Sequence, residues 1–117
     1  MRLAPFRARR LAAMDRTLTR IFVVDDHPMV QEWLSTFLRT QPGLEVCGHA
    51  LEPEAALRGI LAAQPDIAIV DLFLKGGSGL DLIKAMRLHC PKVDIIVLSM
   101  HEEISYAERA LRAGARG

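Results

Sequence analysis

The stretch DIAIVDLFLKGGSGLDL, residues 66–82, joins an apolar run to a single acid and then to a glycine-rich turn. Its first part, DIAIVD, contains only Ile, Val and Ala between two acids, which is typical of a strand buried on both faces of a parallel sheet. Runs of the same kind recur along the chain, so we predict four strands in one sheet. The other three runs are RIFVVD (20–25), LEVCGHA (44–50) and VDIIVLS (93–99).

Between these runs, apolar residues recur at intervals of three and four, the spacing of one helical face. The alternation of strands and helices predicts a doubly wound α/β fold around a parallel sheet. The predicted helices are residues 28–41, 53–64, about 80–89 and about 102–113. The inward stripe of the first helix consists of Val30, Trp33, Leu34, Phe37 and Leu38, and that of the last includes Leu111.

Composition fits one globular domain, because the chain has 117 residues and half of them are apolar. Residues 1–18 are rich in arginine, poor in acids and without periodicity, so we predict a disordered basic leader before a domain at 19–117. No apolar run reaches the roughly 18–20 residues that a membrane span needs. Cys47 and Cys90 lie far apart without CxxC spacing, which favours reduced thiols. We therefore expect a cytoplasmic protein with no membrane partner.

Polar residues stand where three of the predicted strands end. Asp25 and Asp26 end the first strand, Asp71 ends the third and Ser99 ends the fourth. Open parallel sheets bind ligands beyond the carboxyl ends of their strands, so these side chains converge if the first and third strands are neighbours. Three carboxylates that lie close together repel one another, and Mg²⁺, which prefers oxygen ligands, would relieve this repulsion. The sequence therefore predicts a magnesium site that leaves room for a phosphoryl group.

Each of these residues also has an ordinary structural interpretation. A single aspartate at a strand end is more often a helix cap or a turn former, and Ser99 alone would more often be a cap. Three acids at matched strand ends favour the metal site instead. The four histidines lack HxxxH or HExxH spacing, which makes a zinc site unlikely to form from them. The GGSG turn at 76–79 lacks the GK[ST] sequence of a phosphate-binding loop.

Three stretches, VVDDHPMV, IAIVDLFLKGGSGLDLI and IIVLSMHEE, together resemble the receiver domain of two-component response regulators, and most of all the NarL/FixJ subgroup. The resemblance covers residues 19–117 and implies a flavodoxin-like sheet with strand order 2-1-3-4. It implies that a sensor histidine kinase phosphorylates Asp71. Asp26 would bind Mg²⁺ directly, Asp25 would orient a metal-bound water, and Phe73 would offer its backbone carbonyl. Ser99 would bind the phosphoryl group and report it to the next helix.

Family members continue into a fifth strand and helix, whereas this sequence stops at Gly117. We therefore expect a receiver domain without its phosphate-binding lysine and with an exposed edge on its fourth strand. Such an edge promotes self-association. The resemblance further implies a non-enzymatic signalling protein that reaches DNA only through a separate helix-turn-helix domain. Two alternatives stay open: a pseudo-receiver that only binds proteins, and a Mg²⁺-dependent phosphatase. The phosphatase is less favoured because DLF lacks the second acid of a DxD motif.

Overall fold

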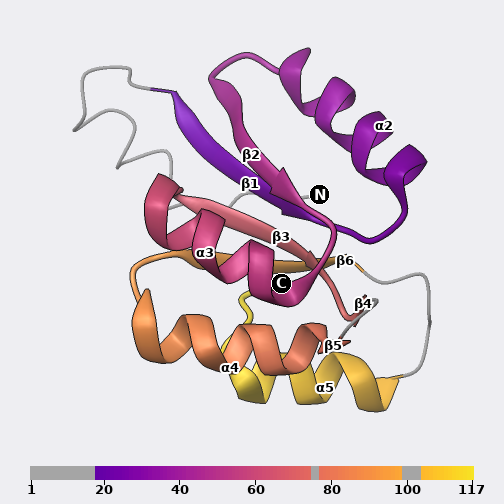
Figure 1. The fold of residues 1–117 in the computed structure, drawn as a ribbon, viewed down its shortest axis with the longest axis vertical. Helices are drawn as coiled ribbons and strands as arrows, with labels where there is room; N and C mark the ends of the chain where they lie inside the picture. Colours follow the sequence, from indigo (N-terminus) through magenta and orange to yellow (C-terminus); the bar gives the residue numbers. More distant parts are fainter. Residues whose placement is uncertain (1–17, 75–76, 99–103) are drawn as a thin grey trace.

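The computed structural model describes residues 18–74, 77–98 and 104–117. Within them the predicted alternation of strands and helices is present (Figure 1). The elements are β1 (Thr19–Val24), α2 (Pro28–Arg39), β2 (Leu44–Ala50), α3 (Pro53–Ala63), β3 (Ile67–Asp71), β4 (Phe73–Leu74), β5 (Gly77–Ser78), α4 (Gly79–His89), β6 (Asp94–Leu98) and α5 (Ile104–Ala113). Ser99 and the start of the last predicted helix lie outside the described residues.

The main sheet has four strands in the order β2-β1-β3-β6, and all of its strand pairs are parallel. This order confirms the predicted 2-1-3-4 arrangement and the doubly wound α/β fold. A second sheet consists of the two-residue strands β4 and β5, which pair antiparallel between β3 and α4. The sequence predicts only a turn here, because two-residue strands leave no periodic signal.

Helices cover both faces of the main sheet (Figure 1). Alternate residues of β1 point to opposite faces, so Ile21 and Val23 pack with Leu34 and Leu38 of α2. Phe22 and the next alternate residue, Val24, lie on the other face, in the larger core that includes buried residues of α3, α4 and α5. These two cores hold the sheet between helical layers.

The apolar stripe of α2 is only partly buried, which corrects the prediction. Leu34 and Leu38 are 6% and 0% exposed, whereas Trp33 and Phe37 are 65% and 45% exposed. The two exposed rings stack with centroids 5.9 Å apart. A helix on a flat sheet buries only the centre of a stripe this wide, so the outer residues face water. Leu111 of α5, predicted to face inward, is likewise exposed.

The outer edge of β6 is partly covered by the end of the chain. The Arg116 amide donates to the Ile95 carbonyl over 2.7 Å, and the Val97 amide donates to the Gly117 carbonyl over 2.5 Å. The outer edge of β6, which was predicted to be exposed, is therefore hydrogen-bonded to the end of the chain at its middle residues. Leu98, the last residue of β6, is 39% exposed.

Candidate functional site

The candidate site lies where β1 and β3 end side by side. Val24 is paired with Val70 in the sheet register, so the next residues, Asp25 and Asp71, emerge at the same level. Both acids are nearly buried, with 4% and 6% of their surface exposed. The apolar runs that precede them are fixed in the core, and this anchoring brings two carboxylates from distant parts of the sequence to one edge.

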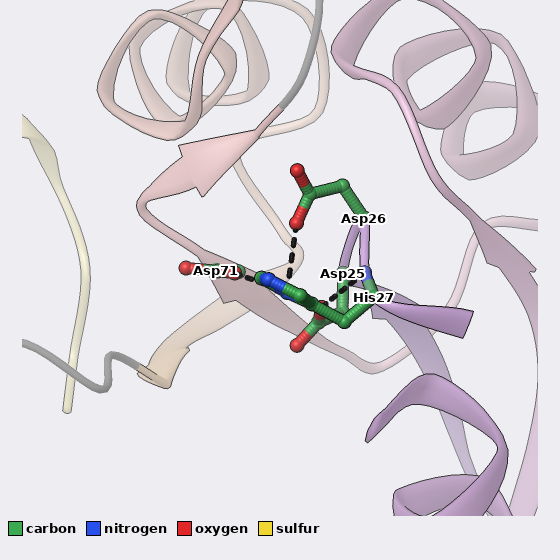
Figure 2. A group of neighbouring side chains, drawn as sticks. All are labelled: Asp25, Asp26, His27 and Asp71. Carbon is green, nitrogen blue, oxygen red and sulfur yellow. Dashed lines mark hydrogen bonds and ion pairs between the residues drawn. The ribbon is translucent and has the colours of Figure 1, made fainter. Parts of the chain in front are cut away.

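Four side chains meet at this edge (Figure 2). The imidazole Nδ1 of His27 lies 3.0 Å from Oδ1 of Asp25, 2.9 Å from Oδ1 of Asp26 and 3.8 Å from Oδ2 of Asp71. One ligand atom from each of the four residues lies within 4.8 Å of all the others. The structure thus brings together the three predicted acids, and we call these four residues the acid cluster.

His27 was not among the predicted site residues. The spacing of the histidines does not point to it, because its partners here are acids and not other histidines. Its position directly after Asp25 and Asp26 was the signal available. The Asp25 carboxylate accepts a hydrogen bond from the His27 amide over 2.8 Å, and this local turn directs the imidazole toward the carboxylates.

Phe73 and Gly79 fix the position of Asp71. The Phe73 amide donates to Oδ1 of Asp71 over 3.0 Å. The Gly79 amide donates to the Leu72 carbonyl over 3.0 Å, which holds the start of α4 against the end of β3. Ser78 caps α4 by accepting a hydrogen bond from the Leu80 amide. The predicted turn therefore acts as a tight connection that braces Asp71.

The electrostatics of the acid cluster reflect its crowding. Burial raises the pKa of the Asp71 carboxyl above its usual value, and the charges of Asp25 and Asp26 act in the same direction, while the hydrogen bond from Phe73 opposes the rise. The hydrogen bond to Asp25 and the charge of Asp26 raise the pKa of His27 above 6.5. The site therefore favours a cation among its carboxylates.

The donor set fits a hard divalent cation. Three carboxylates within reach of one point supply oxygen ligands, which Mg²⁺ prefers over nitrogen. The His27 imidazole lies among these oxygens, but 62% of its side chain is exposed, so it can rotate toward solvent when a metal ion enters. Phe73, whose carbonyl ligation stays a prediction, lies two residues after Asp71, and Ser99 lies outside the described residues.

A cavity of about 360 Å³ adjoins the acid cluster. Asp26 lines this cavity, and so does Arg109 of α5. Much of the remaining wall is apolar and comes from Leu72, Leu74 and Leu80, with Phe73 and Ser78 beside them. Asp26 and Phe73 were predicted as site residues, whereas Arg109 was not, because α5 approaches the site only through the tertiary fold.

The comparisons with known proteins agree on one family. The model of the response regulator receiver domain matches residues 21–117. The DNA-binding transcriptional activator DevR/DosR of Mycobacterium tuberculosis is 31% identical over 100 residues, which are 86% of this chain and 46% of that protein. The transcriptional regulatory protein LiaR of Bacillus subtilis is 31% identical over 98 residues, or 84% of this chain and 46% of LiaR. The chain thus spans about half the length of the curated relatives it matches.

Solved structures agree in fold. A LuxR-family two-component response regulator from Aurantimonas sp. SI85-9A1 has a TM-score of 0.82 at 33% identity, over 86% of this chain and 72% of that one. The signal receiver domain of NarL from Mycobacterium tuberculosis has a TM-score of 0.80 at 31% identity, over 85% and 80% of the two chains. Within the described ranges, no helix has both the length and the apolar character to cross a membrane. The chain belongs to the response regulator receiver domain family of two-component systems, and its relatives include NarL- and LuxR-type transcriptional regulators.

Proposed function

We propose that this receiver domain accepts a phosphoryl group on Asp71 from the phosphohistidine of a sensor kinase, with Mg²⁺ bound beside it. The observation that carries the proposal is the convergence of Asp25, Asp26 and Asp71 within 4.8 Å at the carboxyl edge of the sheet. A buried nucleophilic carboxylate beside a cation site is what phosphoryl transfer to an aspartate needs.

Each residue of the site has a specific role in this proposal. The Phe73 amide occupies Oδ1 of Asp71, so Oδ2, on the side of His27, is the oxygen that attacks phosphorus. Asp26 and Asp71 hold the metal directly, Asp25 orients a metal-bound water, and the Phe73 carbonyl completes the protein ligands. When bound, Mg²⁺ supplies positive charge that offsets the carboxylates and the incoming phosphoryl oxygens.

The signal then passes to another part of the protein. Ser99 binds the phosphoryl group and couples it to α5, which begins five residues later in the chain. One solved relative, the receiver domain of RcsB from Salmonella enterica serovar Typhimurium, was determined in the presence of phosphomimetic BeF₃⁻ and has a TM-score of 0.79 at 26% identity. That similarity supports a phosphorylated state for this chain too.

The output of the whole protein is proposed from its relatives. Because DevR/DosR is a DNA-binding transcriptional activator, we expect this receiver to control transcription through a separate DNA-binding domain. We further propose that the receiver domain occupies residues 19–117 and that the arginine-rich residues 1–18 are a leader ahead of it. The exposed part of the β6 edge and the receiver surface provide for self-association, and the domain acts in the cytoplasm as a signalling module and not as an enzyme.

A mass measurement tests the proposal. The chain is incubated with acetyl phosphate and Mg²⁺, and its intact mass is compared with that of Asp71→Asn. The matched control is Asp81→Asn, which removes an exposed acid from α4 and leaves the acid cluster unchanged. We expect one phosphoryl adduct on the wild type and on the control, and none on Asp71→Asn. A folded wild type that takes no adduct would favour the pseudo-receiver, and turnover of a generic phosphate ester would favour the phosphatase.

A further inference from the structure

We propose that residues 6–11 of this chain, FRARRL, dock in the groove between α3 and α4. The groove is an interaction surface apart from the acid cluster, and docking there does not depend on phosphorylation. The occupant belongs to the arginine-rich leader of the same molecule, so the interaction is intramolecular. Residues 6–11 combine two apolar side chains, Phe6 and Leu11, with three arginines between them.

The groove is apolar inside and acidic outside. It lies between α3 and α4, which pack against each other on one side of the main sheet (Figure 1). Its volume of about 310 Å³ far exceeds the ~30 Å³ that one water molecule takes in the liquid. Leu57, Ala85 and the buried Leu82 line it, together with the exposed acids Glu54 and Asp81. A segment that fills the groove must therefore offer apolar side chains and positive charge together.

Exposed leucines extend this apolar surface toward the carboxyl-terminal ends of both helices. Leu61 follows Leu57 by one turn on α3, and each lies on the same side of that helix. Leu88 follows Ala85 by three residues on α4 in the same way. The side chains of Leu61 and Leu88 are 39% and 76% exposed. An apolar surface that continues beyond the groove favours a covering segment of several residues.

The leader joins the domain at the near end of this surface. The Arg20 guanidinium donates to the Ala63 carbonyl over 2.6 Å, which holds the start of β1 beside the last residue of α3. α3 has 11 residues and is therefore about 16 Å long. Leu11 precedes Thr19 by eight residues, which span at most about 29 Å when extended. Residues 6–11 can thus reach the groove without any change in the described domain.

Charge complementarity also favours this occupant. Residues 1–18 contain five arginines and one acid. Glu54 and Asp81 lie in the first turns of α3 and α4, where acids also offset the helix dipole, but both are exposed to an incoming cation. Glu54 forms an ion pair with Arg58 of the same helix over 3.3 Å. Both side chains of this pair are largely exposed, so the pair is weak and an arginine of the leader can replace Arg58.

Methyl NMR of the full 117-residue chain tests the docking. When the phenyl ring of Phe6 lies in the groove, its ring current shifts the methyl resonances of Leu57 and Leu82, which we call the groove resonances. Phe6→Leu keeps an apolar side chain and removes the ring current, so the groove resonances are expected to move in this variant. The methyl resonances of Leu34 and Leu38, which pack on the opposite face of the sheet, should stay in place and show that the fold is intact.

Removal of the two carboxylates tests the contribution of charge. The double variant Glu54→Gln, Asp81→Asn is expected to shift the docking equilibrium about three- to tenfold toward the open groove, and high salt should shift the wild type in the same direction. The groove resonances then move toward their positions in a chain that carries Phe6→Ser and Leu11→Ser, which serves as the undocked reference. Glu32→Gln, at an exposed position of α2, is the matched control and should leave them unchanged.

Groove resonances that are the same in the wild type, in Phe6→Leu and in the undocked reference would overturn the inference. Groove resonances that respond to neither salt nor the loss of the carboxylates would also overturn it. A shift that appears only as the protein concentration rises would show docking on a second copy and overturn the intramolecular assignment. The salt series on the wild type keeps the test decisive if a variant does not fold. None of these outcomes bears on phosphorylation of Asp71, so the proposed function stands or falls separately.

Discussion

The first residue of α4, Gly79, lies so close to the end of β3 that a Cβ atom at position 79 would overlap the carbonyl oxygen of Asp71 and the Cα of Leu72. The backbone of the proposed acceptor and the start of α4 are therefore in direct contact. A side chain as small as methyl cannot enter this space without moving one of the two segments.

Gly79→Ala is accordingly expected to destabilise the fold by about 1–3 kcal/mol, the usual cost of forcing extra volume into a packed region. Urea unfolding followed by far-ultraviolet circular dichroism measures the change. The control is Gly117→Ala, since a Cβ atom at position 117 would meet nothing within 4 Å. Equal stability of the two variants would show that the contact at Gly79 relaxes freely.

Asp71→Asn is expected to stabilise the metal-free protein, although it abolishes phosphorylation. Burial and the neighbouring charges raise the pKa of Asp71, which means that ionising this carboxyl costs more free energy in the folded protein than in the unfolded chain. An amide removes the charge and retains an oxygen that can accept the Phe73 hydrogen bond. We expect a higher urea midpoint than that of the wild type when both are unfolded with EDTA. Glu32→Gln, at an exposed position of α2, should give no comparable gain.

The stability of the metal-free protein should fall as the pH rises above about 6.5. The pKa of His27 is raised in the folded state by Asp25 and Asp26, so its contribution is complete below 6.5 and is lost as the pH passes through the folded pKa. The pKa of Asp71 is also raised in the folded state, so its contribution to stability is likewise lost as the pH rises, beginning lower, from pH 3.8 upward. Urea midpoints measured with EDTA across this range test the expectation. His27→Gln should flatten the upper part of the profile, whereas His49→Gln, at an exposed strand position, should leave it unchanged.

His27→Gln is also expected to tighten Mg²⁺ binding about two- to fivefold at neutral pH. The imidazole lies 2.9 Å from a carboxylate oxygen that the metal would use, so the two compete for it. Isothermal titration calorimetry measures the affinity. Weaker binding in His27→Gln than in the wild type would instead identify His27 as a ligand of the metal.

The sequence predicted the parts of the fold that depend on continuous local patterns. β1 and β3 each contain four consecutive apolar residues, IFVV and IAIV. Their shared edge followed from parallel topology, so the convergence of Asp25 and Asp71 could be anticipated. The partial exposure of α2 could not be predicted, because helical spacing alone does not show how much of an apolar stripe the sheet covers. Trp33 was therefore predicted to lie in the core, whereas in the structure it lies on the surface.

Two features of the site depend on tertiary structure in the same way. His27 joins the acids through a local turn that no spacing rule describes, and Arg109 reaches the cavity from a helix that is distant in sequence from Asp26. Residue roles that rest on neighbours across the fold leave no pattern along the chain. The proposed role of Ser99 stays a prediction, since this residue lies outside the described ranges.

The exposed ring stack on α2 gives this chain a built-in optical probe. The sequence contains one tryptophan, and 65% of its surface is exposed, so its emission is expected at the wavelengths of an indole in water. Any molecule that covers this side of α2 would move the indole into apolar surroundings and shift the emission to the blue. Fluorescence from the unlabelled protein can therefore report contacts made on the exposed face of α2.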